Sequence, residues 1–134
     1  MYLFGPKYES LGKLDSTTLV IFRKEKGCPL CEAEQAKFLT DWLDPITELG
    51  VKTQIVYSGE KVIDPVSGVS LVHDPKFQVF KEFGAFDEFE NTPVHAVYLL
   101  NKESQVLWSV RVPHAFTDWA PLVKELKRLK RLHP

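Results

Sequence analysis

The chain has 134 residues, of which 44% are hydrophobic and 26% are charged. These are the proportions of an ordinary globular domain, and they exclude disordered and collagen-like chains. Basic and acidic side chains number 17 and 18, for a net charge of −1, so the strongly basic surface of a nucleic-acid-binding domain is absent. The two cysteines are three positions apart, which excludes a disulfide framework spread along the chain.

The length predicts a single domain over residues 1–134, with an irregular lead-in over residues 1–16 that contains Gly5-Pro6 and Gly12 as turn signals. The first residues lack the apolar stretch of a secretory signal, and no window resembles a membrane span. We therefore expect no membrane partner. A cytoplasmic location is favoured, while an exported protein or an excised domain stays open.

The first predicted strand is the continuous apolar run over residues 18–22, which is typical of a strand buried on both faces. A helix is predicted over residues 30–43, where apolar side chains recur every three or four positions. A short helix then begins at Asp44-Pro45 and ends at Gly50, and residues 51–57 form the second strand.

Residues 58–74 read as two turns around short apolar pieces, and Asp74-Pro75 opens a helix that ends at Gly84. Residues 94–100 and 106–112 are two strands joined by a polar turn, and a last amphipathic helix begins at Thr117 or Asp118. This order predicts an α/β fold with a central mixed β-sheet and helices on both faces.

Cys28-Pro29-Leu30-Cys31 lies where the first strand is followed by a helix. The free N–H groups and the positive end of the helix dipole stabilise an anion there, so we expect the pKa of the Cys28 thiol to be lowered. Cys31 is one turn further along and is placed to attack a mixed disulfide at Cys28. The sequence therefore predicts that Cys28 is the nucleophile and Cys31 the resolving thiol.

Two other interpretations of the cysteines stay open: a buried, inert pair, and a metal site. Zinc would need two further ligands, and none of the four histidines forms a second close-spaced pair, so no metal is expected. The histidines are His73, His95, His114 and His133.

Thr92-Pro93 opens a strand that otherwise reads as buried, where proline is normally disfavoured. A cis peptide bond in the turn before the strand would explain the proline. A trans proline at the start of a strand is the alternative.

Four stretches together resemble the thioredoxin-fold superfamily and, within it, the peroxiredoxin-like domains of the alkyl hydroperoxide reductase and thiol-specific antioxidant (redoxin) group. They span the strand and cysteine pair, the Asp74-Pro75 helix with its Gly84-Ala85 end, the late hairpin, and the C-terminal segment. Their residues are 19–31, 72–85, 94–108 and 113–129. The resemblance implies a thioredoxin-like fold. It also implies that Cys28 is the attacking or peroxidatic cysteine and Cys31 the resolving one, with Thr92 and Pro93 beside the sulfurs, presenting backbone to a substrate.

The chain departs from the family pattern at three positions. Peroxiredoxins have a proline seven residues and a threonine three residues before the peroxidatic cysteine, where this chain has Ile21 and Glu25. Thioredoxin has a buried aspartate six residues before its first cysteine, where this chain has Phe22. The missing threonine puts efficient peroxide reduction in doubt, and no proton acceptor for Cys31 is assigned.

His95 and Glu25 are candidates for tuning the pKa of the cysteines. His95 follows Pro93 by two residues and falls on the same side of its strand, where a hydrogen-bonded core histidine is the ordinary interpretation. Arg23, Lys24 and Lys26 precede Cys28 and could lower the pKa of its thiol further, but a solvated loop is the favoured interpretation.

These observations predict a thiol–disulfide oxidoreductase of the peroxiredoxin-like class that needs no cofactor. Its partners would be a protein or small-molecule disulfide, or a peroxide, together with an external thiol reductant. The alternatives are a thiol peroxidase that passes through a sulfenic acid at Cys28, and a redox-inactive binding module that keeps the fold.

Overall fold

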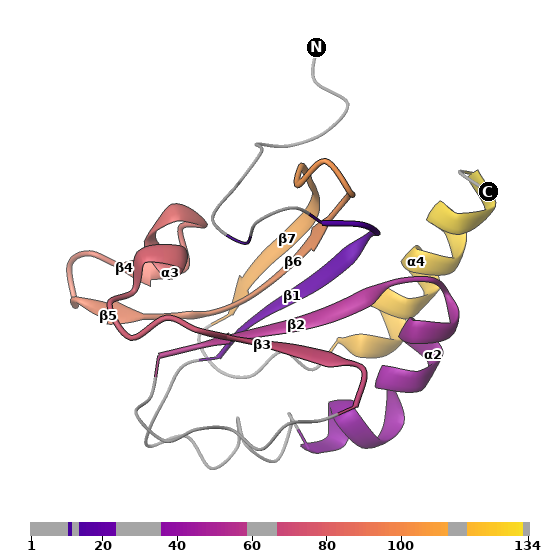
Figure 1. The fold of residues 1–134 in the computed structure, drawn as a ribbon, viewed down its shortest axis with the longest axis horizontal. Coiled ribbons are helices and arrows are strands. Elements are labelled where there is room, and N and C mark those ends of the chain that lie inside the picture. The colour runs from indigo at the N-terminus through magenta and orange to yellow at the C-terminus, as the bar shows by residue number, and fades with distance from the viewer. Residues whose placement is uncertain (1–10, 12–13, 24–35, 59–66, 113–117, 133–134) are drawn as a thin grey trace.

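A computed structural model describes residues 11, 14–23, 36–58, 67–112 and 118–132. Its central feature is a five-stranded sheet in the order β3-β2-β1-β6-β7 (Figure 1). The strands are β1 (Thr18–Arg23), β2 (Lys52–Tyr57), β3 (Val69–His73), β6 (His95–Leu100) and β7 (Val106–Val112). The β1–β2 and β2–β3 pairs are parallel, whereas β1–β6 and β6–β7 are antiparallel. The predicted mixed sheet and late hairpin are confirmed.

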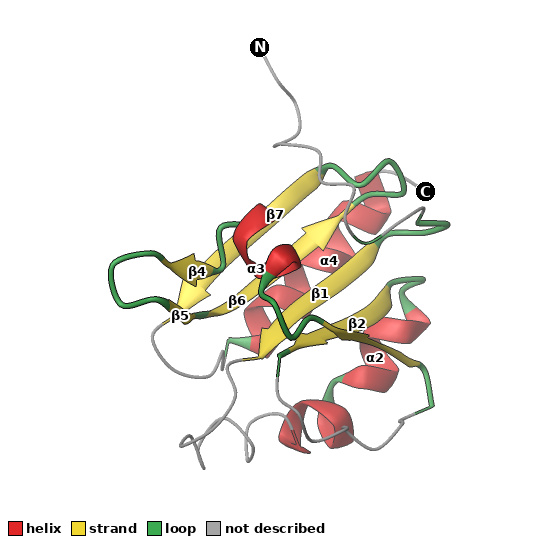
Figure 2. Ribbon diagram, turned by 60° about the vertical axis from the view of Figure 1, so that its left-hand side comes forward, coloured by secondary structure: helices red, strands yellow, loops and turns green. Residues whose placement is uncertain are grey.

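Helices cover both faces of this sheet, as predicted (Figure 2). The helical residues 36–41, α2 (Leu43–Glu48) and α4 (Trp119–Leu132) lie on one face, and α3 (Gln78–Glu82) lies on the other. We call these the α2/α4 face and the α3 face. No helix among the described residues combines the length and apolarity needed to cross a bilayer.

The core on the α2/α4 face is mainly aliphatic, and its buried aromatic members are Phe38 and Trp119. The core on the α3 face is rich in aromatic side chains, including Phe22, Phe80 and Phe83. β1 supplies both cores because successive side chains of a strand point to opposite faces: Leu19 packs on the α2/α4 face, and Val20 and Phe22 pack on the α3 face.

A small antiparallel hairpin, β4 (Phe86–Asp87) and β5 (Thr92–Pro93), precedes β6. The Thr92–Pro93 peptide bond is trans, since no peptide bond between described residues is cis; the expectation of a cis bond was therefore wrong. Pro93 pairs with Phe86 in this separate two-residue strand. Its missing N–H therefore interrupts no ladder of the main sheet, and the lower-energy trans form is accommodated.

Two elements differ from their predicted form. Residues 69–73, predicted as part of a turn region, form the edge strand β3, whose side chains are half-buried or exposed and so give no continuous apolar run. The helix predicted from Asp74-Pro75 to Gly84 is reduced to the five residues of α3, because Phe77 before it has a left-handed backbone with φ of 59°.

Candidate functional site

A row of polar side chains crosses the carboxyl ends of the three parallel strands. Arg23 ends β1, Tyr57 ends β2 and His73 ends β3. Arg23 pairs with Tyr57, and Tyr57 pairs with His73, in the registers of these strands. Residues paired in register share a face of the sheet, so the three side chains form one row at this edge.

His95 extends this row onto the antiparallel side. Phe22 of β1 pairs with Ala96 of β6, and Arg23 and His95 are the next residues of these two antiparallel strands at the same edge. His95 is only 6% exposed. We call Arg23, Tyr57, His73 and His95 the edge row.

The edge row lies on the α2/α4 face. Ile21 and Val97, two residues from Arg23 and His95, pack in the core of that face, and the alternation of a strand returns to the same face every second residue. Helical residues 36–41 cover this same face through Phe38, whose ring centroid lies 4.3 Å from that of Trp119. The two ends of the segment 24–35 are therefore attached to the edge row and to this helix.

Cys28, Cys31 and Glu25 belong to that segment and lie outside the described residues, so their roles stay predictions. What the structure places is the end of β1 directly before them. The carboxyl ends of strands are where open α/β sheets bind their ligands.

Tyr57 and His73 stack at the outer end of the edge row. Their ring centroids are 4.9 Å apart with an interplanar angle of 22°. Tyr57 is buried, whereas His73 is exposed. The stack therefore gives this edge a fixed aromatic surface with an imidazole that solvent can reach.

Thr92 and Pro93 reach the same edge from the β4–β5 hairpin. Pro93 is buried and Thr92 half-buried, and the N–H of Val94 donates to the carbonyl of Ala85 at 3.0 Å, which fixes the entry into β6. Pro93 is thus two residues from His95, as predicted. Their contact with substrate stays a prediction.

Phe22, at the position where thioredoxin has its buried aspartate, is embedded in aromatic rings. Its ring centroid lies 5.1 Å from those of Phe80 and Phe83 and 5.5 Å from that of Tyr98. An ionised carboxylate would be strongly disfavoured in these surroundings. Any proton acceptor for the second thiol must therefore come from elsewhere.

Asp74, the acid of the Asp74-Pro75 motif, serves the backbone of α3. Its carboxylate accepts hydrogen bonds of 2.9–3.0 Å from the N–H groups of Gln78, Val79 and Phe80. Asp74 is 5% exposed. This aspartate is therefore a buried helix cap.

Sequence reasoning missed part of the edge row. The favoured placement of Arg23 in a solvated loop is wrong: Arg23 is the half-buried last residue of β1, because the ladder with β2 continues to the Arg23–Tyr57 pair. His73 was considered only as a metal ligand, and Tyr57 was not singled out. The signal that connects them is their position at the ends of parallel strands, which becomes visible only once β3 is recognised as a strand.

The described residues contain no group of three or more His, Cys, Asp or Glu side chains arranged to hold a metal ion. His114 and His133 lie outside them. The edge row contains a guanidinium, two imidazoles and a phenol. These groups can bind anions through hydrogen bonds, and the imidazoles can also accept and release protons.

No protein-family model matches the sequence, and no curated protein matches it. Solved structures do match in fold. AhpC of Enterococcus faecalis superposes with a TM-score of 0.78 at 14% identity, over 98% of this chain and 95% of that one. A peroxiredoxin-like protein of Aquifex aeolicus gives a TM-score of 0.66 at 19% identity, covering 88% of this chain and 74% of that one.

Peroxiredoxin Q of Xanthomonas campestris is similar in the same way, with a TM-score of 0.63 at 19% identity over 90% of this chain and 81% of that one. These identities are low, so the likeness is one of fold. The chain therefore has the thioredoxin-like α/β fold in the form found in peroxiredoxins.

Proposed function

We propose that this protein is a thiol-based oxidoreductase of the peroxiredoxin-like class, with Cys28 as the nucleophile and Cys31 as the resolving thiol. The observation that carries the proposal is the fold, which matches a peroxiredoxin structure over 98% of the chain, together with a Cys-Pro-Leu-Cys motif that comes shortly after β1 in the sequence.

The reaction with a disulfide begins when the Cys28 thiolate attacks one substrate sulfur and the other leaves as a thiolate. The Cys31 thiolate then attacks the Cys28 sulfur and releases the second substrate thiolate. The two enzyme thiols have then lost two electrons and formed one disulfide, and the substrate has gained them as a dithiol. An external thiol reductant reverses the oxidation of the enzyme.

Peroxide reduction is the second candidate, favoured by the peroxiredoxin identity of the structural neighbours, one of which is described through its alkyl peroxide reduction activity. Here the Cys28 thiolate attacks one peroxide oxygen and the O–O bond breaks. The sulfur is oxidised to a sulfenic acid, and the other oxygen leaves as an alkoxide that takes a proton from solvent to become an alcohol. Cys31 then condenses with the sulfenic acid, forming the disulfide and releasing water.

One pair of assays separates the two reactions. Wild-type protein is supplied with a dithiol reductant, and consumption of alkyl hydroperoxide is compared with reduction of insulin disulfides. Cys28→Ser should abolish both activities, because it removes the proposed nucleophile and leaves Cys31 as the only cysteine of the chain. Cys31→Ser should stop turnover and trap Cys28 as a mixed disulfide or a sulfenic acid. Activity that survives in Cys28→Ser would refute the proposal. Inertness of wild-type protein in both assays would also refute it and would favour the alternative of a redox-inactive binding module.

We further propose that the edge row lowers the pKa of the Cys28 thiol. A guanidinium close to a thiolate favours the charged form, and Arg23 is five residues before Cys28 at the end of β1. The test is the pH dependence of Cys28 alkylation. Arg23→Gln should move the midpoint to higher pH and Arg23→Lys should restore it, whereas an unchanged midpoint in Arg23→Gln would exclude this role. His95→Gln is examined in the same assay.

A further inference from the structure

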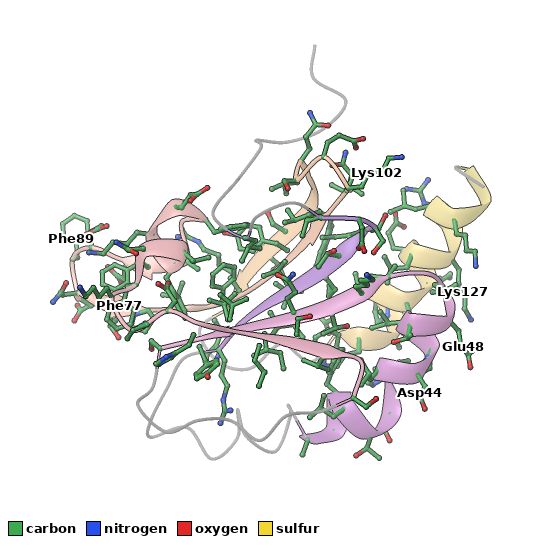
Figure 3. All side chains as sticks on the ribbon, viewed as in Figure 1. Asp44, Glu48, Phe77, Phe89, Lys102 and Lys127 are labelled. Carbon is green, nitrogen blue, oxygen red and sulfur yellow. The ribbon has the colours of Figure 1, made fainter. Side chains whose placement is uncertain are left out.

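The tip of the β4–β5 hairpin presents a lone aromatic side chain to solvent. Phe89 is fully exposed, and it is the only large hydrophobic side chain among the described residues with that status. Burial of this ring against a partner surface would gain hydrophobic free energy. Figure 3 shows Phe89 at the far end of the molecule from Lys102 and Lys127.

The backbone around Phe89 is held in place. The carboxylate of Asp87 accepts hydrogen bonds from the N–H groups of Phe89, at 2.9 Å, and Glu90, at 3.1 Å. At the base of the hairpin, the Phe86 ring packs against Phe77 with centroids 5.3 Å apart. The exposed ring therefore projects from a preorganised turn, which lowers the entropic cost of binding through it.

Acidic side chains flank this ring. Glu88 and Glu90 are both exposed. We call Glu88, Phe89 and Glu90 the acidic tip. Its chemistry fits an apolar recess with basic groups on its rim.

A groove with this character lies at the opposite end of the sheet. It has a volume of about 790 Å³ and lies between α4, the turn joining β6 to β7, and the residues just before β1 and β2. Its apolar lining comprises Leu49, Val51, Leu99, Leu107, Leu126 and Leu129. A phenylalanine ring fits a recess of this size and composition.

The rim of the groove carries two lysines, Lys102 and Lys130, both exposed, and one acid, Glu103. Among the lining residues the basic groups outnumber the acid, and α4 also carries exposed Lys124, Lys127 and Arg128 against one acid, Glu125. The groove is therefore complementary in polarity and in charge to the acidic tip.

We infer that the acidic tip of one copy of this chain seats Phe89 in the groove of a second copy. The two features lie at opposite ends of the same molecule, so a chain cannot fill its own groove with its own tip. Contacts of this head-to-tail kind repeat from copy to copy and give chains or rings. A single hairpin tip buries little surface, so each contact is weak.

Sedimentation velocity over a concentration series up to about 1 mM tests the inference, because small interfaces associate weakly. Wild-type protein should sediment as species larger than one copy as concentration rises, more so at low salt. Phe89→Ser should weaken the association by about tenfold or more, since it removes the buried ring. A wild-type protein that stays monomeric throughout, or a Phe89→Ser variant that associates as wild type does, overturns the inference.

Charge reversal supplies the matched control. Glu90→Lys and Lys130→Glu should each weaken association at low salt by about threefold to tenfold. An equimolar mixture of the two variants should associate more strongly than either alone, because the basic tip of one meets the altered rim of the other. Asp44→Lys and Lys37→Glu, exposed positions outside the tip and the groove lining, should leave association unchanged. A mixture that associates no better than its components overturns the inference.

Photo-crosslinking identifies the occupant. With p-benzoylphenylalanine at position 89, crosslinks should join two copies and map to residues 49–51, 99–107 or 126–130 of the second copy. Intermolecular crosslinks that map elsewhere, or crosslinking only to an unrelated protein or small molecule added to the sample, would overturn the assignment of a second copy as the occupant.

Discussion

The two faces of the central sheet are packed by different means. On the α2/α4 face, α4 supplies 14 helical residues whose apolar stripe lies on a mainly aliphatic core. On the α3 face, the helix has only five residues and the core is rich in aromatic side chains. A helix of five residues gains little from its own hydrogen bonds, so α3 depends on tertiary contacts.

Those contacts are hydrogen bonds from side chains to backbone, combined with ring packing. The Asp74 carboxylate caps the start of α3, and the Tyr98 hydroxyl donates to the carbonyl of Phe83 at its end. The N-cap residues themselves, Trp42 of α2 and Phe77 of α3, make no side-chain cap hydrogen bond, so the cap of α3 comes from Asp74, which precedes its N-cap. The comparison indicates that burial of an apolar stripe stabilises one face, whereas specific polar contacts position the helix on the other.

The largest expected effect comes from removing the ring at the centre of the α3 face. Phe22→Ala should destabilise the protein by about 3–5 kcal/mol, since it leaves a cavity and removes three ring contacts. Leu19→Ala, on the same strand but on the α2/α4 face, should cost less. Urea denaturation measures both. A larger loss for Leu19→Ala would contradict the central role given to the aromatic cluster.

The same contrast explains what the sequence could predict. Strands β1, β2, β6 and β7 and helix α4 were predicted correctly because each has a long apolar run or stripe, which is visible in the periodicity of the sequence. β3 was missed because an edge strand buries little and shows no such run. The length of α3 was overestimated because the left-handed backbone of Phe77 delays the start of the helix, so that Asp74 caps it from four residues before Gln78.

The candidate site divides in the same way. Pro93, His95 and the cysteines were singled out from local motifs. Tyr57 and His73 can be recognised as members of the edge row only from the register between β2 and β3. That register joins residues 16 positions apart, and the composition of the sequence does not reveal it. The cis form of Pro93 failed as a prediction because it assumed that the proline opens a strand of the main sheet, whereas it pairs with Phe86 in a separate hairpin.

Removing the cap of α3 should have the next largest effect. Asp74→Ala leaves three buried or half-buried N–H groups without their acceptor and should cost about 2–3 kcal/mol. Asp74→Asn, which keeps one carbonyl acceptor, should recover part of it. Amide hydrogen exchange should accelerate at residues 78–80 in Asp74→Ala.

The matched variant on the other face is Asp44→Ala, an exposed acid in the first turn of α2. It should cost no more than about 0.5 kcal/mol, because it removes only a favourable interaction with the helix dipole. Equal losses in Asp74→Ala and Asp44→Ala would refute the claim that the two helices are held differently.

A smaller effect is expected at the other end of α3. Tyr98→Phe keeps the ring, which packs against Phe22 and Phe83, and removes only the hydroxyl that donates to the Phe83 carbonyl. The loss should be about 1 kcal/mol. Tyr98→Leu, which also removes the ring, should cost more. If Tyr98→Phe is as stable as wild type, ring packing alone holds the end of α3.

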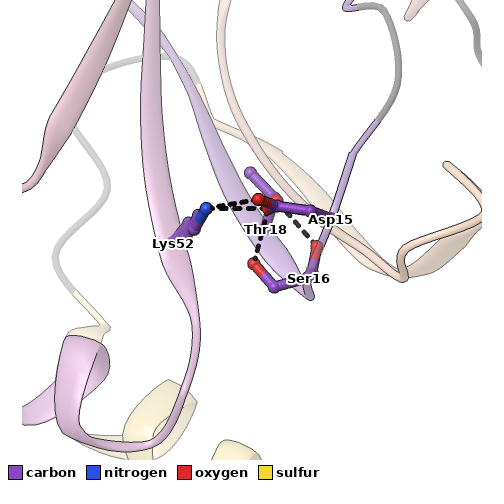
Figure 4. Close-up of polar contacts among 4 residues, drawn as sticks. All are labelled: Asp15, Ser16, Thr18 and Lys52. Carbon is purple, nitrogen blue, oxygen red and sulfur yellow. Dashed lines mark hydrogen bonds and ion pairs between the residues drawn. The ribbon is translucent and has the colours of Figure 1, made fainter.

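The smallest effect should come from an ion pair that belongs to neither core. Lys52, the first residue of β2, donates to both carboxylate oxygens of Asp15 at 2.7 and 2.8 Å (Figure 4). Both side chains are mostly exposed, so solvent screens the interaction. The hydrogen bond from Lys52 and its positive charge hold the pKa of Asp15 below the usual value of the carboxyl.

This lowered pKa gives the pH dependence its sign. The stabilisation by the pair is present above the pKa that Asp15 has in the unfolded chain, and it is lost as pH falls through the lower pKa of the folded state. Lys52→Gln should therefore be slightly less stable than wild type at neutral pH and equally stable in acid, with the neutral-pH difference shrinking in high salt. Urea denaturation at several pH values measures this. A difference as large as that of Asp74→Ala would contradict the claim that this exposed pair contributes less to stability than the polar contacts of α3.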